Sequence, residues 1–460
     1  MSDATIRIQR LPVRLEPSQR RVLLRPFLPS LVVKPALAEK ESEAAAAESA
    51  SRSAVGAAVE SSTPAEPDRL RQLERHLGGL TPSEVEAQLE RLKRRFQGRH
   101  LDLEALADRH QRSVVARLPE LRGWDSDRLL LLGCYLTHEY ALESAALFNP
   151  SLVPHPDQEG LAPGERRVVL SLRATGEGHI SSIVFRTGVL AANAELRLDQ
   201  PSPFVQQGEI LRPGPTGRHY EVRYGPGGDL SERVLFPATA EESNGLEDAR
   251  FVAFEEGGSR RWFATCTAYD GREVRIQAIE TEDFRQFRLF PLAGRAIRNK
   301  GLALFPRRLG GRSLMLGRQD GVNVHLMESD DPNRWDRSAV LLEPREPWEF
   351  VQLGNCGSPI ETEAGWLVLT HGVGAMRQYS IGAVLLDRED PSQVLGRLRE
   401  PLLVPNAEER NGYVPNVVYS CGGLIHAGQL LLPYAMSDSA CRFALVPLKP
   451  LLEELQRPKG

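Results

Sequence analysis

The feature that most constrains this chain is a weak repeat in its C-terminal two thirds. Short runs rich in β-branched and aromatic residues alternate there with Gly, Pro, Asp and Asn. Segments that begin near Glu247, Gly301, Gly357 and Val414 each contain three strand-like runs and a glycine-rich turn, and their starts are 54, 56 and 57 residues apart. This period suits four-stranded propeller blades. With a fifth unit over about 150–240, the sequence predicts a mainly β fold, a five-bladed β-propeller with an N-terminal α-helical extension.

The N-terminal part of the chain differs in composition from this β-rich region. Residues 1–35 alternate basic and apolar side chains, which is compatible with one or two strands presenting either a basic groove or a solvated face. Residues 36–68 are rich in Ala, Glu and Ser, which is typical of a flexible linker. We therefore predict a strand-like segment, a linker, a helical extension over 69–146 and a propeller catalytic domain over 147–460.

Helical signals are clearest just after the linker. The run Thr-Pro-Ser-Glu at 81–84 is a capping box with proline at the first helical position, and apolar side chains recur on one helix face through residues 85–96. Further helical patterns cover 101–118 and 126–148. We interpret this region as a helical cap or as an oligomerisation element through which the chain forms a homo-oligomer.

Charge and cysteine usage exclude several classes of protein. The 61 acidic and 57 basic side chains give a formal net charge of −4, without the basic excess of nucleic-acid and membrane-surface binders. No apolar run is long enough to span a bilayer, and no secretory signal pattern opens the chain. The five cysteines are scattered and form no C-x-x-C pair, so we expect a reduced, cytoplasmic protein with no metal site.

Two adjacent carboxylates, Glu247 and Asp248, lie in the run from Asn244 to Phe251. They lead directly into a predicted strand. Adjacent residues of a strand face opposite ways, so these two side chains are not expected to reach one substrate together. One of them would then be catalytic and the other structural. The alternative is a pair of acids that only caps a loop.

Three basic side chains, Lys300, Arg318 and His371, fall at strand ends in consecutive predicted blades. Together they could bind a phosphate dianion through charge-assisted hydrogen bonds, although each alone is more typical of a surface cation or a core histidine. No G-x-S-x-G run, Walker loop or dinucleotide-binding glycine pattern is present. His138 and His179 have no partner at metal-ligand spacing.

Ordered residue runs occur in successive predicted blades. They are Gly-Leu-Glu-Asp-Ala-Arg-Phe at 245–251, Leu-Phe-Pro at 304–306, Gly-Ser-Pro-Ile at 357–360, His-Gly-Val at 371–373, Ile-Gly-Ala-Val-Leu-Leu-Asp at 381–387 and Asn-Val-Val-Tyr at 416–419. As a set these runs resemble glycoside hydrolase family 130, which contains mannoside phosphorylases and related mannosidases on a five-bladed β-propeller. The resemblance covers roughly residues 147–455 and leaves the first 140 residues out.

The resemblance implies a role for each matching position. Asp248 matches the general acid that protonates the glycosidic oxygen, in the phosphorylases through a sugar hydroxyl. The residues matching sugar-binding groups are Asn149, Asp438 and Glu409, and those matching phosphate-binding groups are Arg173, Lys300, Arg318 and His371. Two departures stand out, because the family's Glu-Asp-Pro-Arg is Glu-Asp-Ala-Arg here and its His-Arg-Pro is Gly-Arg-Gln at 317–319.

The resemblance implies an inverting phosphorylase that cleaves a β-mannoside with inorganic phosphate to give α-mannose 1-phosphate. Phosphate would be a co-substrate, and no cofactor is expected. The alternatives are an exo-acting β-mannosidase, for which Glu409 is the candidate base, and a non-catalytic propeller that binds a saccharide. Retention of all four cationic positions favours phosphorolysis, because a phosphate nucleophile needs cations whereas water needs a carboxylate base.

Overall fold

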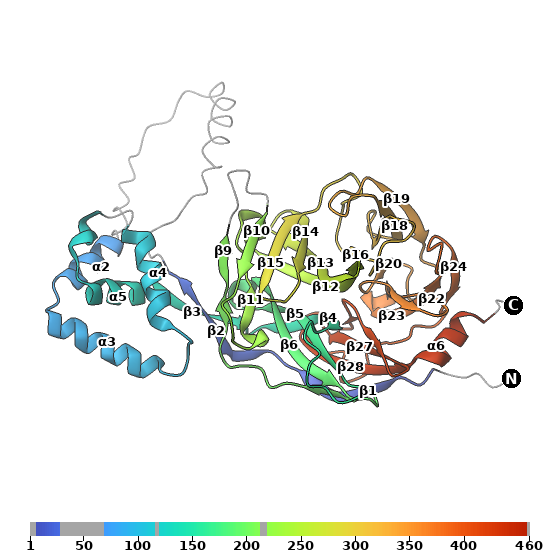
Figure 1. Cartoon of the computed structure of the whole chain (residues 1–460), viewed down its shortest axis with the longest axis horizontal. Helices are drawn as coiled ribbons and strands as arrows, with labels where there is room; N and C mark the ends of the chain where they lie inside the picture. The colour runs from blue at the N-terminus through green and yellow to red at the C-terminus, as the bar shows by residue number, and fades with distance from the viewer. Residues whose placement is uncertain (1–5, 28–68, 116–118, 212–218, 458–460) are drawn as a thin grey trace, which may run out of the picture. The chain divides into compact units, whose positions relative to one another are not determined.

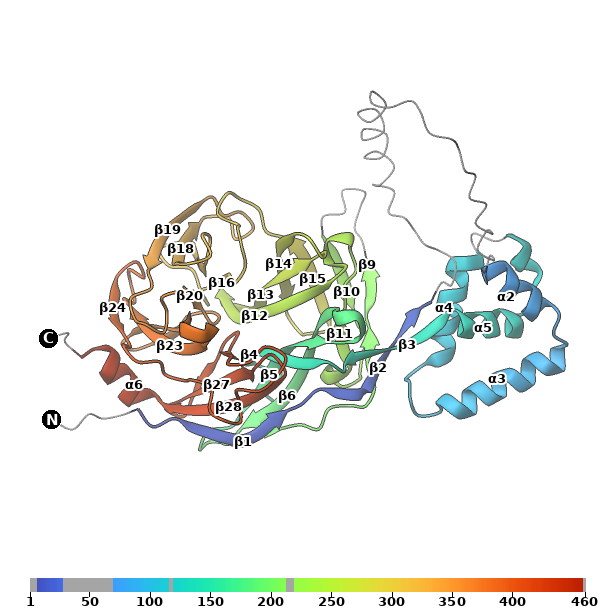
Figure 2. The same ribbon diagram turned by 180° about the vertical axis from the view of Figure 1, so that it is seen from behind.

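The computed structural model describes residues 6–27, 69–115, 119–211 and 219–457, so the predicted linker at 36–68 lies outside the described residues. The chain divides into two compact units, a helical unit of residues 24–139 and a β-rich unit of residues 1–23 and 140–460. Among the described residues, no helix has the length and apolar character needed to cross a bilayer. Figures 1 and 2 show both units from opposite sides.

The described part of the helical unit contains four α-helices and a short 3-10 turn. They are α2 (Arg69–Gly78), α3 (Pro82–Phe96), α4 (Leu103–Val115), η1 (Pro119–Gly123) and α5 (Ser126–Tyr135). The capping box at the start of α3 is present, because the Thr81 side chain accepts from the Glu84 amide and Glu84 accepts from the Thr81 amide at 2.8 Å. Val85 and Leu89 on the predicted apolar stripe are buried in the core of this unit.

The helix predicted over 126–148 is shorter in the structure. Helix α5 ends at Tyr135, where the Leu136 amide and the Thr137 hydroxyl donate to carbonyl groups of the last turn. The chain then forms strand β3 (Thr137–Glu143) and strand β4 (Ala146–Pro154). Strand β4 pairs with β5 (Arg166–Thr175). The hydrogen bonds of this sheet stabilise the strand more than the local residue pattern favours a helix.

The β-rich unit confirms a mainly β fold. Its first strands are β1 (Gln9–Leu15), β2 (Ser18–Pro26), β5 (Arg166–Thr175), β6 (Ser181–Leu190), β7 (Leu196–Leu198), β8 (Gln206–Gln207), β9 (Glu209–Leu211), β10 (Tyr220–Arg223), β11 (Arg233–Leu235), β12 (Gly245–Glu256), β13 (Ser259–Tyr269), β14 (Val274–Thr281) and β15 (Gln286–Pro291). The remaining strands are β16 (Ala303–Leu304), β17 (Ser313–Gly317), β18 (Val324–Ser329), β19 (Arg337–Leu342), β20 (Gln352–Asn355), β21 (Ile360–Thr362), β22 (Gly365–Val373), β23 (Tyr379–Leu386), β24 (Val394–Arg397), β25 (Val418–Tyr419), β26 (Leu424–His426), β27 (Gln429–Met436) and β28 (Ala440–Pro447). Helix α6 (Leu448–Leu455) follows, and the short turns are η2 (Glu177–His179), η3 (Leu230–Glu232), η4 (Ala240–Glu242) and η5 (Ala375–Arg377).

These strands form successive antiparallel sheets. Strands β16 to β19 make a four-stranded sheet, and β20 to β24 make a five-stranded one. Strands β4 to β15 form a twelve-stranded sheet. Within it, β6 and β12 pair in parallel through a single residue pair, Ser181 and Gly245. Strands β25 to β28 form another five-stranded sheet with β1, which pairs with β28. Figure 1 shows the sheets following one another from green through yellow and orange to red.

The N-terminal segment predicted as strand-like contains strands β1 and β2. Strand β1 pairs antiparallel with β28, with Gln9 opposite Leu445 and Leu15 opposite Cys441. In β2, the Arg21 side chain is buried and its Nε lies 3.1 Å from the buried Glu143 carboxylate. The first residues of the described chain therefore belong to the β-rich unit, held by sheet hydrogen bonds and by a buried ion pair.

Candidate active site

A cavity of about 170 Å³ in the β-rich unit brings together seven of the eight residues proposed as a site. Its lining includes carboxylates, an amide and cations that come from strands of different sheets. The lining residues are Asn149, Arg173, Asp248, Lys300, Arg318, His371, Arg377, Tyr379, Val414, Val417, Tyr419 and Asp438. The missing residue is Glu409.

Two β-bulges place the first polar pair of this cavity. The pairing of β4 with β5 shifts between Phe148 and Ser151, and that of β12 with β13 shifts between Glu247 and Arg250. Asn149 and Asp248 lie inside these shifts with φ of 50° and 51°, in the left-handed region. Such bulges redirect a side chain and store backbone strain near functional sites. The Asn149 amide donates to the Asp248 carboxylate at 2.6 Å.

The bulge in β12 also changes the expected relation between the two adjacent acids. Both Glu247 and Asp248 contact the guanidinium of Arg173, with N–O distances of 2.7 and 3.4 Å, so strict alternation across the strand does not hold here. Only Asp248 lines the cavity, whereas Glu247 is buried beside Lys300, whose Nζ lies 3.8 Å from its carboxylate. This arrangement agrees with one acid facing a ligand and the other supporting the cations.

The electrostatics separate the carboxylates of this cluster. Burial raises the pKa of Asp248, but Arg173, Lys300 and the Asn149 amide outweigh burial and hold the pKa below its ordinary value. Burial and the nearby charge of Asp248 raise the pKa of Asp438 to about 6. Burial also raises the pKa of Glu247. Asp248 is therefore the ionised acid, and Asp438 holds a proton more readily.

A second part of the cavity lining, apart from the carboxylates, is basic. The Arg318 guanidinium donates to Nε2 of His371 at 3.2 Å, and among the described residues no carboxylate forms an ion pair with it. Burial and the charges of Arg318 and Arg250 lower the pKa of His371 well below its ordinary value, so this ring is a neutral group at neutral pH. A half-buried arginine without an acidic partner is suited to bind an anion.

Five lining residues were not predicted from the sequence, and the three polar ones are Arg377, Tyr379 and Tyr419. Arg377 has a φ of 55° in turn η5, which joins β22 to β23 directly after the strand that carries His371. The rings of Tyr379 and Tyr419 pack against His371 at centroid distances of 6.0 and 4.9 Å. Tyr419 lies in the Asn-Val-Val-Tyr run, and this run could have identified it as a site residue. No sequence pattern identifies Arg377, which lies in a turn.

The structure does not bring Glu409 to the cavity. Its side chain is fully buried elsewhere in the β-rich unit, where it accepts hydrogen bonds from Arg10, Tyr434 and Arg442 and from the amide of Asn406. A carboxylate with these four partners is held in place, and it does not line the cavity that holds the other predicted residues.

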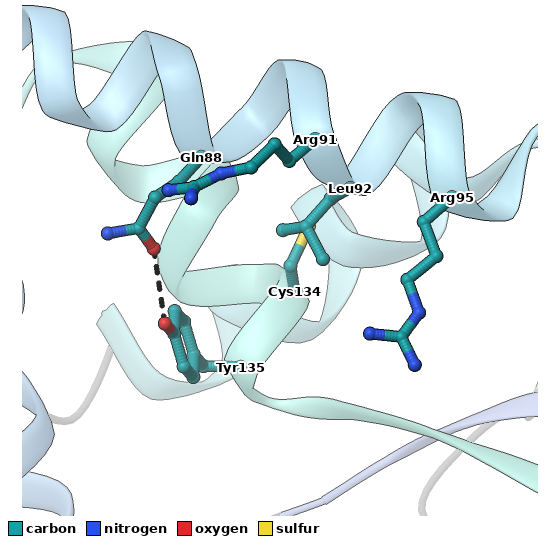
Figure 3. Close-up of a pocket in the computed structure, with 6 residues that line it drawn as sticks. All are labelled: Gln88, Arg91, Leu92, Arg95, Cys134 and Tyr135. Atoms are coloured by element: carbon teal, nitrogen blue, oxygen red, sulfur yellow. Dashed lines mark hydrogen bonds between the residues drawn. The ribbon is translucent and has the colours of Figure 1, made fainter.

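A second pocket of about 320 Å³ lies within the helical unit, between α3 and α5 (Figure 3). Its lining residues are Gln88, Arg91, Leu92, Arg95, Cys134 and Tyr135. The set contains no carboxylate, and burial raises the pKa of the Cys134 thiol to about 11, which disfavours the reactive thiolate. This pocket therefore offers neither an acid nor a nucleophile.

A half-buried acid and an arginine without an acidic partner among the described residues share one cavity, which can therefore combine proton transfer with binding of an anion. The family model described as "beta-1,4-mannooligosaccharide phosphorylase" matches residues 229–457. A 1,2-beta-oligomannan phosphorylase of Thermoanaerobacter sp. is 36% identical over 226 residues, which are 48% of this chain and 75% of that protein. A beta-1,4-mannooligosaccharide phosphorylase of Ruminococcus albus is 30% identical over 328 residues, 67% of this chain and 85% of that protein.

Among solved structures, the beta-1,2-mannobiose phosphorylase of Listeria innocua aligns with 69% of this chain and 93% of its own, with 20% identity and a TM-score of 0.51. This likeness shows a shared fold. From the sequence relatives, the chain belongs to glycoside hydrolase family 130 and is an enzyme, a glycoside phosphorylase. The family and the enzyme class predicted from the residue runs are confirmed.

Proposed function

We propose that this protein is an inverting phosphorylase that cleaves a β-mannoside with inorganic phosphate and releases α-mannose 1-phosphate. The observation that carries this proposal is one cavity that holds both a half-buried carboxylate, Asp248, and a guanidinium without an acidic partner among the described residues, Arg318. Sequence relatives named as phosphorylases of β-1,2- and β-1,4-linked mannosides support the substrate class.

The proposed reaction breaks the bond between the anomeric carbon and the glycosidic oxygen. A phosphate oxygen attacks that carbon from the face opposite the leaving group, and its electron pair forms the new bond as the old pair moves to the glycosidic oxygen. That oxygen takes the proton of Asp248, directly or through a sugar hydroxyl. A β-linkage attacked in this way gives an α-phosphate. Asn149 and Asp438 would hold the mannosyl unit, while Arg173, Lys300, Arg318 and His371 would hold phosphate.

The acid role of Asp248 requires a change in protonation. The cations beside it keep its pKa low, so the Asp248 carboxyl is ionised when these cations are its main neighbours. A phosphate dianion beside Lys300 and Arg173 would offset their positive charge and raise the pKa of Asp248. Binding of the co-substrate would thus favour the protonated acid, and this coupling suits phosphorolysis better than hydrolysis.

The position of Glu409 also supports phosphorolysis. An inverting hydrolase needs a second carboxylate that activates water. Glu409, the candidate for that role, is buried and bonded to Arg10, Tyr434 and Arg442 away from the cavity. The proposed reaction uses phosphate as a co-substrate and no cofactor.

We also propose that the β-rich unit is a five-bladed propeller. Its strands fall into five antiparallel groups, β4 to β7, β12 to β15, β16 to β19, β20 to β24 and β25 to β28 with β1. All five cysteines are free thiols, which agrees with the reduced, cytoplasmic location expected from the sequence.

The test is incubation of the purified chain with β-1,2- and β-1,4-linked manno-oligosaccharides in the presence and absence of phosphate. Phosphate-dependent formation of mannose 1-phosphate is expected. Release of free mannose at the same rate without phosphate would instead establish a mannosidase, and absence of turnover on every glycoside would establish a binding protein.

A further inference from the structure

The buried carboxylate of Glu409 connects the N-terminal strand to the cavity. Arg10 in β1 donates from Nε to Glu409 at 3.0 Å and from Nη2 to the Val404 carbonyl at 2.7 Å. Tyr434 donates to the same carboxylate at 2.6 Å, and Arg442 lies 3.3 Å away. A buried carboxylate is costly without such partners, so Glu409 depends on the cations that face it.

Arg10 reaches this carboxylate because of sheet pairing. Strand β1 pairs with β28, with Arg10 opposite Ala444, and the register then shifts before Arg14 comes opposite Arg442. Figure 2 shows β1 running beside β28. The other cation, Arg442, also pairs with the exposed Glu408 at 3.2 Å. Arg10 is therefore the cation that contacts both oxygens of Glu409, at 3.0 and 3.2 Å.

The backbone around Glu409 holds the turn that carries Asp438. The Ser437 hydroxyl donates to the Glu409 carbonyl at 2.6 Å. The Val414 amide donates to the Ser437 carbonyl at 3.0 Å, and the Ser437 amide donates to the Val417 carbonyl at 2.8 Å. Ser437 and Asp438 both have left-handed backbones, with φ of 48° and 52°. Such a conformation persists only where its surroundings hold it.

Three cavity residues, Val414, Val417 and Asp438, thus lie on segments tied to Glu409. The groups assigned to phosphate, by contrast, come from β5, the loop before β16, the end of β17 and β22. We propose that Arg10 is a positioning residue for the sugar side of the cavity, acting through Glu409 on the 405–417 segment and on Asp438. This inference rests on the proposed function of the cavity.

The experiment compares Arg10→Ala and Arg10→Lys with Arg14→Ala in the full chain. Arg14 is a matched control, because it lies on the same strand and its ion pair among the described residues is with the exposed Glu16. We expect Arg10→Ala to raise the KM for the mannoside by about 10-fold or more, since small misplacements of binding groups have effects of this size. The KM for phosphate should stay near that of the wild type. Arg10→Lys should recover part of the loss, and Arg14→Ala should show none.

A double-variant comparison tests the route through Glu409. In a Glu409→Gln background the charge that Arg10 neutralises is gone, so adding Arg10→Ala should raise the mannoside KM much less than it does in the wild type. Equal effects in the two backgrounds would overturn the proposal. An equal rise in both KM values with a fall in Tm would overturn it as well, because that is the signature of a general loss of structure.

Hydrogen–deuterium exchange separates failure of this inference from failure of the proposed function. Faster exchange in Arg10→Ala is expected at 405–417 and 434–439 and not across the remaining strands. If the wild type shows no phosphate-dependent turnover but this local change occurs, the proposed function fails and the positioning role stands. Unchanged exchange in both segments would overturn the positioning role regardless of activity.

Discussion

At the residue scale, the charge of Asp248 depends on the few groups that contact its carboxylate. Its carboxylate accepts from Asn149 and lies 3.4 Å from Arg173. Replacing Asp248 with Asn keeps the shape but leaves no proton to donate. We expect Asp248→Asn to lower kcat by about 100-fold to 10,000-fold, the range of general acid catalysis, without a fall in Tm.

The control for this variant is Asp199→Asn, which changes an exposed acid that accepts from Thr187 outside the cavity. Its kcat should match the wild type in a steady-state assay. An Asp248→Asn protein with wild-type kcat would contradict the assignment of the acid.

Arg318 provides a test of the anion site. Charge-assisted hydrogen bonds are worth about 1.5–3 kcal/mol, so Arg318→Ala should raise the KM for phosphate by about 10-fold to 100-fold. Arg312→Ala is a suitable control, because Arg312 precedes the same strand and pairs with the exposed Glu328 at 2.8 Å. Initial rates over a range of phosphate concentrations measure the effect. A phosphate KM equal to that of the Arg312 variant would remove Arg318 from the site.

Asp438 predicts a pH dependence of stability. Its pKa is raised from 3.8 to about 6, so the folded state binds this proton more tightly than the unfolded chain does. The stability that this proton contributes is lost as the pH rises from 3.8 through about 6. An asparagine does not ionise, so Asp438→Asn should gain up to about 3 kcal/mol in the free energy of unfolding relative to the wild type near pH 8.

This gain should shrink as the pH falls toward about 4, where the wild-type carboxyl is also neutral. Denaturant unfolding of both proteins across this range measures it. A difference that is the same at every pH would mean that Asp438 is not held with a raised pKa.

At the element scale, the strands and the helix start were predictable and the irregularities were not. Apolar runs such as those in β13 and β22 marked strands because they stay buried on both faces. The bulges at Asn149 and Asp248 break the period-2 pattern by one residue, and no local residue pattern specified them. Asp248, Lys300, Arg318 and His371 were picked out from the residue pattern, whereas Asn149, Arg173 and Asp438 were found only through the resemblance. The Arg10–Glu409 pair was missed because its members lie in distant parts of the chain.

The capping box of α3 gives a prediction at this scale. Thr81→Ala removes the hydroxyl that accepts from the Glu84 amide, which should cost about 1 kcal/mol of stability in the helical unit. Thermal unfolding of the full chain followed by circular dichroism measures the change, with Glu86→Ala at an exposed position of the same helix as the control. Catalytic rates should be unchanged, because the cavity lies wholly in the β-rich unit. Equal Tm values for the two variants would contradict the capping role.

At the scale of the whole molecule, a near-zero net charge conceals a strongly polarised cavity. The formal net charge is −4, yet Arg173, Lys300, Arg318 and Arg377 line one small space. Strand β5, the loop before β16, the end of β17 and turn η5 supply these groups, so they come from segments far apart in the sequence. The fold shows where the positive charge gathers.

The central claim is phosphorolysis with inversion, and NMR tests it most directly. Following a β-linked manno-oligosaccharide and phosphate by ¹H and ³¹P spectra records phosphate consumption and the configuration of the first sugar phosphate formed. The account predicts that each bond cleaved consumes one phosphate and yields the α-anomer of mannose 1-phosphate. Free mannose as the first product, with phosphate unchanged, would contradict it.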